Sequence, residues 1–282
     1  MIEVFYTLAI TAMACGILGP ILVMRRLSMT ADALSHSVLL GIILAFLVIL
    51  RIDSIWLKLS AAIFGLFTVL LVEFISEKAK IKKDDSLAIV FPTFFALAVI
   101  LITRFCRNAH LDVEIVLMGN PLFAPFIRIF NMPKSMFLMG IVFIINLLFI
   151  VFNYREISMV CFDEEFAKMQ GINLKRLYTI FMTLVSLTAV LAFDSVGGIL
   201  VMSFFIAPAA AACLYTKSFD KTIMLTLVFG ILSSYLGYYF GIKYNVSLSG
   251  MSAVIDMLLV FISIAINTII IMMYRHIKKV NY

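Results

Sequence analysis

Apolar residues fall in long blocks along this 282-residue chain, and short polar connectors separate the blocks. Each block has about twenty residues, the length that a helix needs to cross a bilayer core of about 30 Å. The pattern therefore predicts nine membrane-spanning helices, at residues 4–24, 33–50, 57–76, 86–103, 136–152, 177–193, 195–215, 222–241 and 251–273.

The number of membrane spans depends on how two segments, residues 194–198 and 113–127, are interpreted. The connector at residues 194–198 is so short that the count becomes eight if the blocks on either side of it do not both cross. Residues 113–127 are apolar but include a glutamate, an asparagine and two prolines. A span there would move nine basic residues of later connectors to the opposite side. We therefore expect a surface or re-entrant segment, because irregular backbone at membrane depth must be buried in protein.

Composition agrees with an integral membrane protein and excludes several classes. Hydrophobic residues make up 64% of the chain and charged residues 13%, with a mean hydropathy of +1.14. Soluble domains are about half apolar and a quarter charged. The four cysteines have no CxxC spacing, which excludes a disulfide framework and a thiolate metal site. We expect residues 1–282 to form one all-α, polytopic membrane domain with eight or nine spans.

The distribution of basic residues predicts the orientation of the chain in the plasma membrane. The sequence has 22 Lys and Arg against 16 Asp and Glu. Basic residues collect in the cytoplasmic connectors of membrane proteins. With the N-terminus outside and nine spans, 15 basic residues fall on the cytoplasmic side and 7 on the outer side. This split favours an outer N-terminus and a cytoplasmic C-terminus.

Motifs for energy conversion and hydrolysis are missing from the sequence. No glycine is followed directly by lysine, so the phosphate-binding loop GxxxxGK[ST] is absent. There is no HExxH pair either, which removes the simplest intramembrane metalloprotease. We therefore expect this chain not to be an enzyme, and any ATP hydrolysis to belong to a separate subunit.

Asp32 and His36 are the first candidate site. They are four residues apart, so both project from one face of a helix. His36 lies ten residues after the pair Arg25-Arg26, about 15 Å along a helix and close to mid-membrane. A carboxylate and an imidazole at that depth are costly unless they face a cavity, a partner charge or a metal. Together they are a half-site for Zn(II), Mn(II) or Fe(II). A structural pair joining two helices, or a helix cap by Asp32, fits these residues equally well.

The second candidate is the polar segment 161–176, which lies on the predicted cytoplasmic side. Phe162, Phe166 and Met169 recur at helical spacing with acidic and basic residues between them, and Gly171 ends the short helix. An amphipathic helix of this kind is suited to docking another protein. An ordinary solvated loop helix is the alternative.

The third candidate is the block that begins at Val196. Gly197, Gly198 and Pro208 interrupt it, and small residues at 207–212 allow neighbouring helices to approach closely. Pro208 removes one backbone hydrogen bond, so we expect a kink there. Kinked helices with small residues suit moving transporters but also occur in static bundles.

These three segments, in this order, resemble the permeases of the zinc, manganese and iron ABC importer family. The likeness to the family patterns RR-x(5)-DALSH-x(4)-G, FDxExA-x(3)-G and VGxLLV…IAPAATA covers most of residues 15–215. The matching positions are Arg25-Arg26, residues 32–36 and Gly41; Phe162-Asp163, Glu165, Ala167 and Gly171; and Val196-Gly197, residues 199–201 and 206–210.

The resemblance implies a homodimeric permease, two copies of an ATPase subunit and an extracytoplasmic metal-binding lipoprotein. It implies that a divalent metal, manganese foremost and zinc or iron otherwise, is transported as substrate, with no permanently bound cofactor. Asp32 and His36 of both copies then converge at the dimer axis as a metal site. The coupling segment, residues 161–176, is implied to enter a cleft of the ATPase, with contacts by Phe162, Asp163, Glu165, Phe166, Ala167 and Gly171.

Two other functions remain open. A secondary transporter driven by an ion gradient would use Asp32, His36, Asp194 or Asp256 as a proton relay, because intramembrane carboxylates and broken helices also fit that class. An intramembrane enzyme would use Asp32 and His36 as acid and base or as metal ligands. Asp256 matches no pattern of the family, and carboxylate and imidazole ligands do not distinguish among the three metals.

Overall fold

The computed structural model of the chain describes residues 2–49, 55–105, 121, 128–129 and 132–280, without the side chains of residues 30–32, 34–36, 38, 55, 57–58, 83–84, 194 and 274–280. Helices account for nearly all of this backbone. They are α1 (Ile2–Gly16), α2 (Gly19–Met24), α3 (Ser28–Ile49), α4 (Ile55–Ala79), α5 (Lys83–Phe105), α7 (Lys134–Phe152), α8 (Tyr154–Phe162), α9 (Glu164–Met169), α10 (Leu174–Val196), α11 (Gly198–Tyr215), α12 (Phe219–Tyr244) and α13 (Leu248–Val280). Two short strands are β1 (Arg128–Ile129) and β2 (Met132–Pro133).

The predicted all-α membrane architecture is confirmed. Within the described part of the chain, eight helical segments are long and apolar enough to cross a membrane. They coincide with eight of the nine predicted blocks, and the remaining block, 33–50, lies in α3, a continuous helix of 22 residues. The blocks on either side of residues 194–198 form the separate helices α10 and α11.

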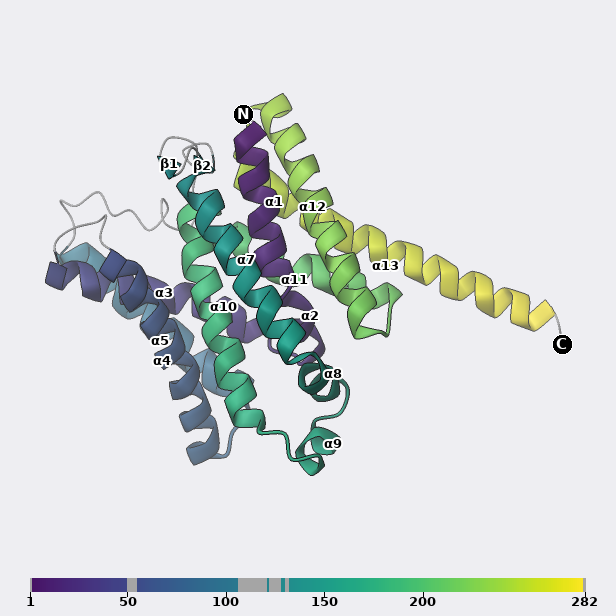
Figure 1. Cartoon of the computed structure of the whole chain (residues 1–282), viewed down its shortest axis with the longest axis horizontal. Helices are drawn as coiled ribbons and strands as arrows, with labels where there is room; N and C mark the ends of the chain where they lie inside the picture. The colour runs from purple at the N-terminus through teal and green to yellow at the C-terminus, as the bar shows by residue number, and fades with distance from the viewer. Residues whose placement is uncertain (1, 50–54, 106–120, 122–127, 130–131, 281–282) are drawn as a thin grey trace.

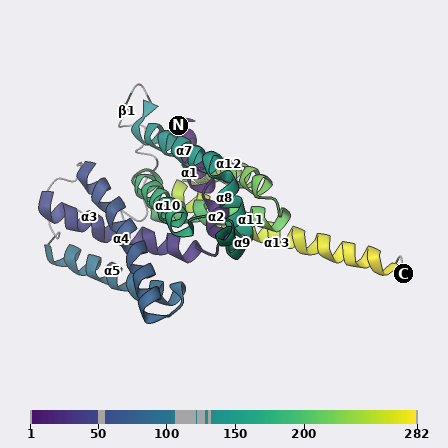
Figure 2. The ribbon, with the colours of Figure 1, turned by 60° about the horizontal axis from the view of Figure 1, so that its bottom comes forward.

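The first spanning segment, made of α1 and α2, lies at the centre of the molecule. Helices α7, α10, α11 and α12 pack around it. Its most apolar stretch of 18 residues is 78% buried, more than that of any of the other seven segments. Helices α3, α4 and α5 pack against one another in a separate group at one side, where α10 contacts α4 (Figures 1 and 2). Helix α13 packs on α11 and α12 and then extends away from the other helices toward the C-terminus (Figure 1). The core therefore lies around α1 and α2.

The first span is not one continuous helix, as the sequence predicted for residues 4–24. The chain turns at residues 17–18, and α2 restarts at Gly19 with Pro20 in its first turn. Proline is tolerated there because that position needs no intrahelical N–H bond. A Cβ at Gly19 would lie only 2.5 Å from the Phe205 carbonyl oxygen and 2.9 Å from the Ala209 Cβ, both on α11. The interruption thus allows α2 to pack directly on the α11 backbone.

The second interruption lies between α10 and α11 and agrees with the sequence. Gly197 caps both helices with φ of +85°, a left-handed value that glycine adopts without strain. Helix α11 then continues as an α-helix through Pro208, which is buried. The kink expected at Pro208 stays a prediction.

A few buried polar side chains join the helices. Asn146 on α7 donates from Nδ2 to the Ala14 carbonyl of α1 at 3.1 Å and to Thr188 Oγ1 of α10 at 2.9 Å. On the other side of the core, Ser203 of α11 donates to Asp256 Oδ2 of α13 at 2.7 Å. Such bonds are needed because apolar surroundings give an unpaired polar group no alternative partner.

The segment read as a surface or re-entrant stretch, residues 113–127, lies outside the described residues except for Pro121, which is buried. The hairpin that follows it was not predicted from the sequence. In it Arg128 pairs with Pro133 and Ile129 with Met132 in antiparallel register. Arg128 also forms an ion pair of 3.1 Å with Glu3 at the beginning of α1. The hairpin is thereby fixed to the N-terminal end of the core.

The close contact at Gly19 leads to a stability prediction. Gly19→Ala inserts a methyl group against the backbone of α11, and overpacking of this kind costs about 1–3 kcal/mol. We expect a lower thermal unfolding temperature in detergent. Gly140→Ala on α7 is the matched control, because a Cβ there meets nothing within 4 Å. Equal unfolding temperatures for the two variants would contradict the packing described at Gly19.

Candidate functional site

Helix α3 carries both residues of the predicted metal site. Asp32 and His36 are one turn apart on its backbone, in its first half. Their side chains, and that of Asp194, lie outside the described residues. Within the described side chains, no three His, Cys, Asp or Glu residues gather as a metal-binding group. The metal site therefore stays a prediction that depends on the placement of these two residues on α3.

The half of α3 beyond His36 is fixed tightly against α4. A Cβ at Gly41 would lie 2.6 Å from the Phe64 Cβ and 3.1 Å from the Ala61 Cα, so only glycine allows this approach. The Ser60 hydroxyl of α4 also donates to the Gly41 carbonyl at 3.0 Å. The glycine that follows the Asp32–His36 pair in the sequence thus has a packing role, and it holds the helix that carries the pair at a fixed distance from α4.

The coupling segment, residues 161–176, begins at the end of α8, contains the whole of α9 and reaches the start of α10. Asp163 lies between α8 and α9, and its Oδ1 accepts a hydrogen bond of 2.9 Å from the Phe166 N–H, which caps α9. At the other end, Gly171 has φ of +78°, and the N–H groups of Gly171 and Ile172 bond back to the carbonyls of Lys168 and Ala167. This arrangement is a Schellman cap. Sequence analysis predicted the helix and its end at Gly171, but not the separate helix α8.

The residues matched to the coupling pattern divide by exposure. Ala167 is fully buried and packs into the main hydrophobic core. Phe162 is 56% exposed and Phe166 44% exposed, and Glu165 is also exposed. Met169, which the family pattern does not include, is 80% exposed. Asp163, Ala167 and Gly171 therefore define the shape of the segment, whereas the aromatic and Met side chains are available for contact.

Sequence analysis missed the contacts that Arg25 makes with this segment. Arg25 Nη1 lies 3.0 Å from Glu164 Oε2 and donates to the Val160 carbonyl at 3.1 Å. Lys168 Nζ approaches the other oxygen of Glu164 at 3.4 Å. Partial burial raises the pKa of Glu164, but the positive charges of Arg25 and Lys168 outweigh this effect and hold that pKa below its ordinary value. No sequence signal identifies a pair separated by more than a hundred residues.

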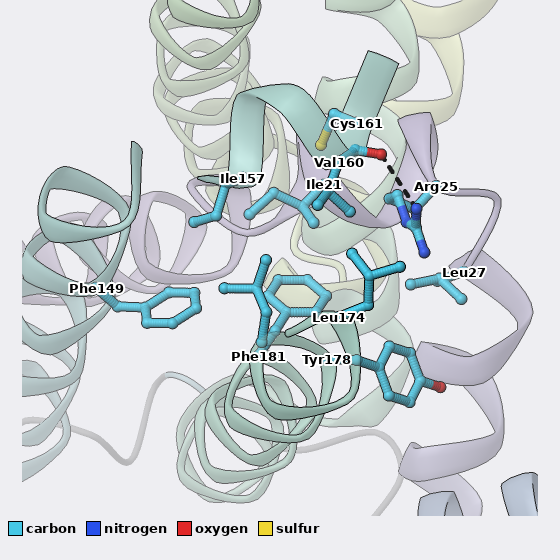
Figure 3. A pocket seen from close by; sticks show the side chains of 11 residues that line it. Ile21, Arg25, Leu27, Phe149, Ile157, Val160, Cys161, Leu174, Tyr178 and Phe181 are labelled. Atoms are coloured by element: carbon cyan, nitrogen blue, oxygen red, sulfur yellow. Dashed lines mark hydrogen bonds between the residues drawn. The ribbon is translucent and has the colours of Figure 1, made fainter. Parts of the chain in front are cut away.

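A pocket lies beside Arg25, between α2, α7, α8 and α10 (Figure 3). Its lining is mostly apolar, and its cavity volume is about 30 Å³, about enough for one water molecule. Ile157, Leu174 and Phe181 face the space, and Arg25 lies at its edge with the bond to the Val160 carbonyl (Figure 3). A small apolar pocket therefore lies between the end of α8 and α10.

Asp256, whose role the sequence left open, is buried between helices. Its exposure is 1%, and Ser203 bonds to Oδ2, while Oδ1 has no hydrogen-bond partner among the described atoms. The hydroxyl of Ser252, one turn earlier on α13, is also buried without a partner there. Asp256 thus faces α11 and α12 rather than the α3–α5 group, because α13 packs on α11 and α12.

Comparisons with known proteins agree with this architecture. Residues 1–267 match the ABC 3 transport family. The manganese transport system membrane protein MntD of Bacillus subtilis is 38% identical over 86% of this chain and 84% of its own length. The zinc transport system membrane protein TroD of Treponema pallidum is 33% identical over 89% of this chain and 70% of its own length.

A solved structure shows the same fold. PsaBC from Streptococcus pneumoniae, in complex with Fab, has a chain that superposes with a TM-score of 0.78 and is 30% identical. The match covers 93% of this chain and 89% of that one. A profile match over nearly the whole length, relatives above 30% identity and a shared arrangement of helices agree with one another. This chain is a membrane protein that belongs to the ABC 3 transport family of transporter permeases.

Proposed function

We propose that this chain is the transmembrane permease of an ATP-driven importer of divalent transition metal ions, with manganese foremost and zinc or iron as the alternatives. The observation that carries this proposal is the pair Asp32 and His36, one turn apart on α3. The names of the relatives point to the same cargo, because one is a manganese and another a zinc transport protein. Carboxylate oxygen and imidazole nitrogen are ligands that all three metals accept.

One copy of the pair supplies only two ligands, so a complete site needs a second copy. In a dimer with a two-fold axis along the translocation path, Asp32 and His36 of each protomer contribute two carboxylates and two imidazoles. Four such ligands suit a divalent ion that has lost most of its water. Gly41 and its close contact with α4 support this role, because they fix the helix that presents the pair.

Energy enters, in this proposal, through the coupling segment and a separate ATPase. Phe162, Phe166 and Met169 present apolar surface on the segment, and buried aromatic anchors dominate protein interfaces. The N-terminus and α9 lie at opposite ends of the molecule (Figure 1), which supports an outer N-terminus and a cytoplasmic coupling segment. Two ATPase copies, one for each permease, and an extracytoplasmic binding lipoprotein complete the proposed complex.

The transport cycle then needs three events. The binding lipoprotein releases the metal at the outer mouth, and the ion exchanges its water for the oxygen and nitrogen ligands of Asp32 and His36. Closure of the ATPase dimer around ATP displaces the coupling segment. That displacement shifts the membrane helices so that the metal site opens toward the cytoplasm. The protein itself performs no covalent step.

We predict that Asp32→Ala and His36→Ala each abolish metal uptake. Even the loss of a group that only orients a metal ligand lowers affinity by 10–100-fold, so loss of a ligand is expected to reduce uptake by about 100-fold or more. Uptake of Mn(II) into proteoliposomes that contain the permease, its ATPase and ATP measures the effect. Val48→Ala, on the exposed side of α3, is the matched control and should transport normally.

Transport at the wild-type rate by either ligand variant would show that the site assignment is wrong. The same vesicles test the source of energy. Uptake that continues without ATP but stops when the proton or sodium gradient is removed would favour the secondary transporter instead.

We also predict that Phe166→Glu weakens binding of the ATPase. The substitution places a charge where an exposed aromatic ring is expected to be buried in the partner, and losses of this kind reach tenfold or more in affinity. Co-purification of ATPase with permease, measured against permease content in the membrane, gives the result. Lys217→Ala, an exposed change in the connector between α11 and α12, should have no effect. Equal recovery of ATPase with both variants would contradict the docking role of Phe166.

A further inference from the structure

We propose that Arg25 is a positioning residue that transmits movement of the coupling segment to α3, and so to the metal site. This inference rests on the proposed function. It assigns to Arg25 a role that differs from ATPase docking and from metal binding. The residue joins two corners of the chain, one between α2 and α3 and the other between α8 and α9.

Arg25 makes two contacts at the α8–α9 corner. The Val160 carbonyl belongs to the last turn of α8, where carbonyls have no partner within the helix. Arg25 satisfies it at 3.1 Å (Figure 3). The same Nη1 forms the ion pair of 3.0 Å with Glu164, the first residue of α9. One guanidinium group therefore contacts the end of one helix and the beginning of the next.

The backbone of Arg25 belongs to the turn between α2 and α3. Arg25 ends α2, and the N–H groups of Arg26 and Leu27 bond back to the carbonyls of Val23 and Leu22 at 3.1 and 2.7 Å. These bonds form a Schellman cap, in which Arg26 takes the left-handed position with φ of +57°. Helix α3 begins two residues later, at Ser28. The corner is thus a defined, hydrogen-bonded turn and not a loose loop.

Only a short stretch of chain separates the α2–α3 corner from the proposed metal ligands. Asp32 lies four residues after the beginning of α3, a distance of about 6 Å along the helix. Arg25 lies seven residues before the first proposed ligand, and only the hydrogen-bonded turn and the first turn of α3 separate the two. Next to the pair, Ala33 packs in a cluster with residues of α4 and α5, and Gly41 farther along is packed against α4, so a displacement of α3 is passed on to these two helices.

An apolar pocket lies beside the α8–α9 corner. The pocket lies next to Arg25 and borders both α8 and α10. Burial raises the pKa of the Cys161 thiol in its lining to about 12, despite the nearby charge of Arg25, so this side chain stays neutral. A small shift of α8 toward α10 meets mostly apolar side chains in this pocket, so no network of polar contacts opposes it there. Arg25 is the charged contact that would carry the displacement to α3.

The ion pair itself contributes little to stability. The Arg25 side chain is 19% exposed and that of Glu164 44% exposed, and ion pairs near the surface are weak. We therefore expect Arg25→Gln to fold, insert and bind the ATPase like the wild type. The effect should instead appear in the amount of metal transported per ATP hydrolysed, because the two corners are no longer joined.

The experiment compares Arg25→Gln with Arg26→Gln in proteoliposomes that contain the complete complex. Both variants remove one positive charge from the same basic pair, so any effect on membrane orientation is shared. Arg26 is exposed and its side chain has no hydrogen bond or ion pair among the described contacts. We expect the ratio of Mn(II) transported to ATP hydrolysed to fall about tenfold for Arg25→Gln and to stay unchanged for Arg26→Gln, while ATPase co-purifies equally with both.

A second pair of variants separates transmission from a general structural defect. If Arg25 acts through Glu164, the double variant Arg25→Gln/Glu164→Gln should be no worse than Arg25→Gln alone, because interacting residues give non-additive effects. Arg25→Lys, which keeps the charge but loses the forked donor geometry, should restore part of the ratio.

The outcomes distinguish this inference from the proposed function. A wild-type ratio in Arg25→Gln, with ATP-dependent uptake intact in the wild type, would overturn the transmission role and leave the importer proposal standing. Loss of ATPase binding in Arg25→Gln would also overturn it, because Arg25 would then serve docking. Absence of ATP-dependent Mn(II) uptake by the wild-type complex would instead contradict the proposed function.

Discussion

The structure depends on one constraint: polar groups inside a membrane protein have to find partners within the protein, because lipid offers none. Helices satisfy their own backbone, so the few interruptions and buried polar side chains require local solutions. The turn before Gly19 is covered by the backbone of α11. The amide of Asn146 bonds to α1 and α10 at once. Asp256 is shielded by α11 and α12, with a serine on one of its oxygens.

The same constraint gives the molecule two regions with different packing. Around α1 and α2 the helices approach closely, and small residues such as Gly19 and Ala209 allow this. At the α8–α9 corner, polar groups lie at helix ends, where Arg25 and Asp163 satisfy them, and a pocket remains beside them. A tightly packed apolar centre and a corner held by polar contacts fit a transporter in which one part receives a force and another stays rigid.

Much of the architecture was predictable because it follows from the length and spacing of apolar blocks. Most spanning helices begin and end within a few residues of the predicted blocks, and the short helix that ends at Gly171 follows from composition alone. The turn before Gly19 was missed because the apolar pattern continues through it. Helix α8 was missed because its polar residues resemble a connector. The hairpin at Arg128 depends on pairing between strands of two residues, too short for a periodic pattern.

In the candidate site, too, some residues could be predicted from the sequence and others could not. Asp32 and His36 could be selected from the sequence because a carboxylate and an imidazole within an apolar block are costly and share a helical face. Arg25 could be identified as part of a basic pair that favours the cytoplasmic side and matches the family pattern, but not as a residue that contacts the coupling segment. Its partner Val160 is 135 residues away, and only the fold brings them together. Sequence patterns thus indicate which residues are unusual, whereas the contacts indicate which elements they connect.

The metal content of the purified permease–ATPase complex tests the central claim most directly. After equilibration with Mn(II) and removal of free ion, elemental analysis should find about one manganese for every two permease chains, as expected for a site of four ligands shared by two copies. The double variant Asp32→Ala/His36→Ala should retain almost none. Equal manganese content in the wild type and the double variant would contradict the account.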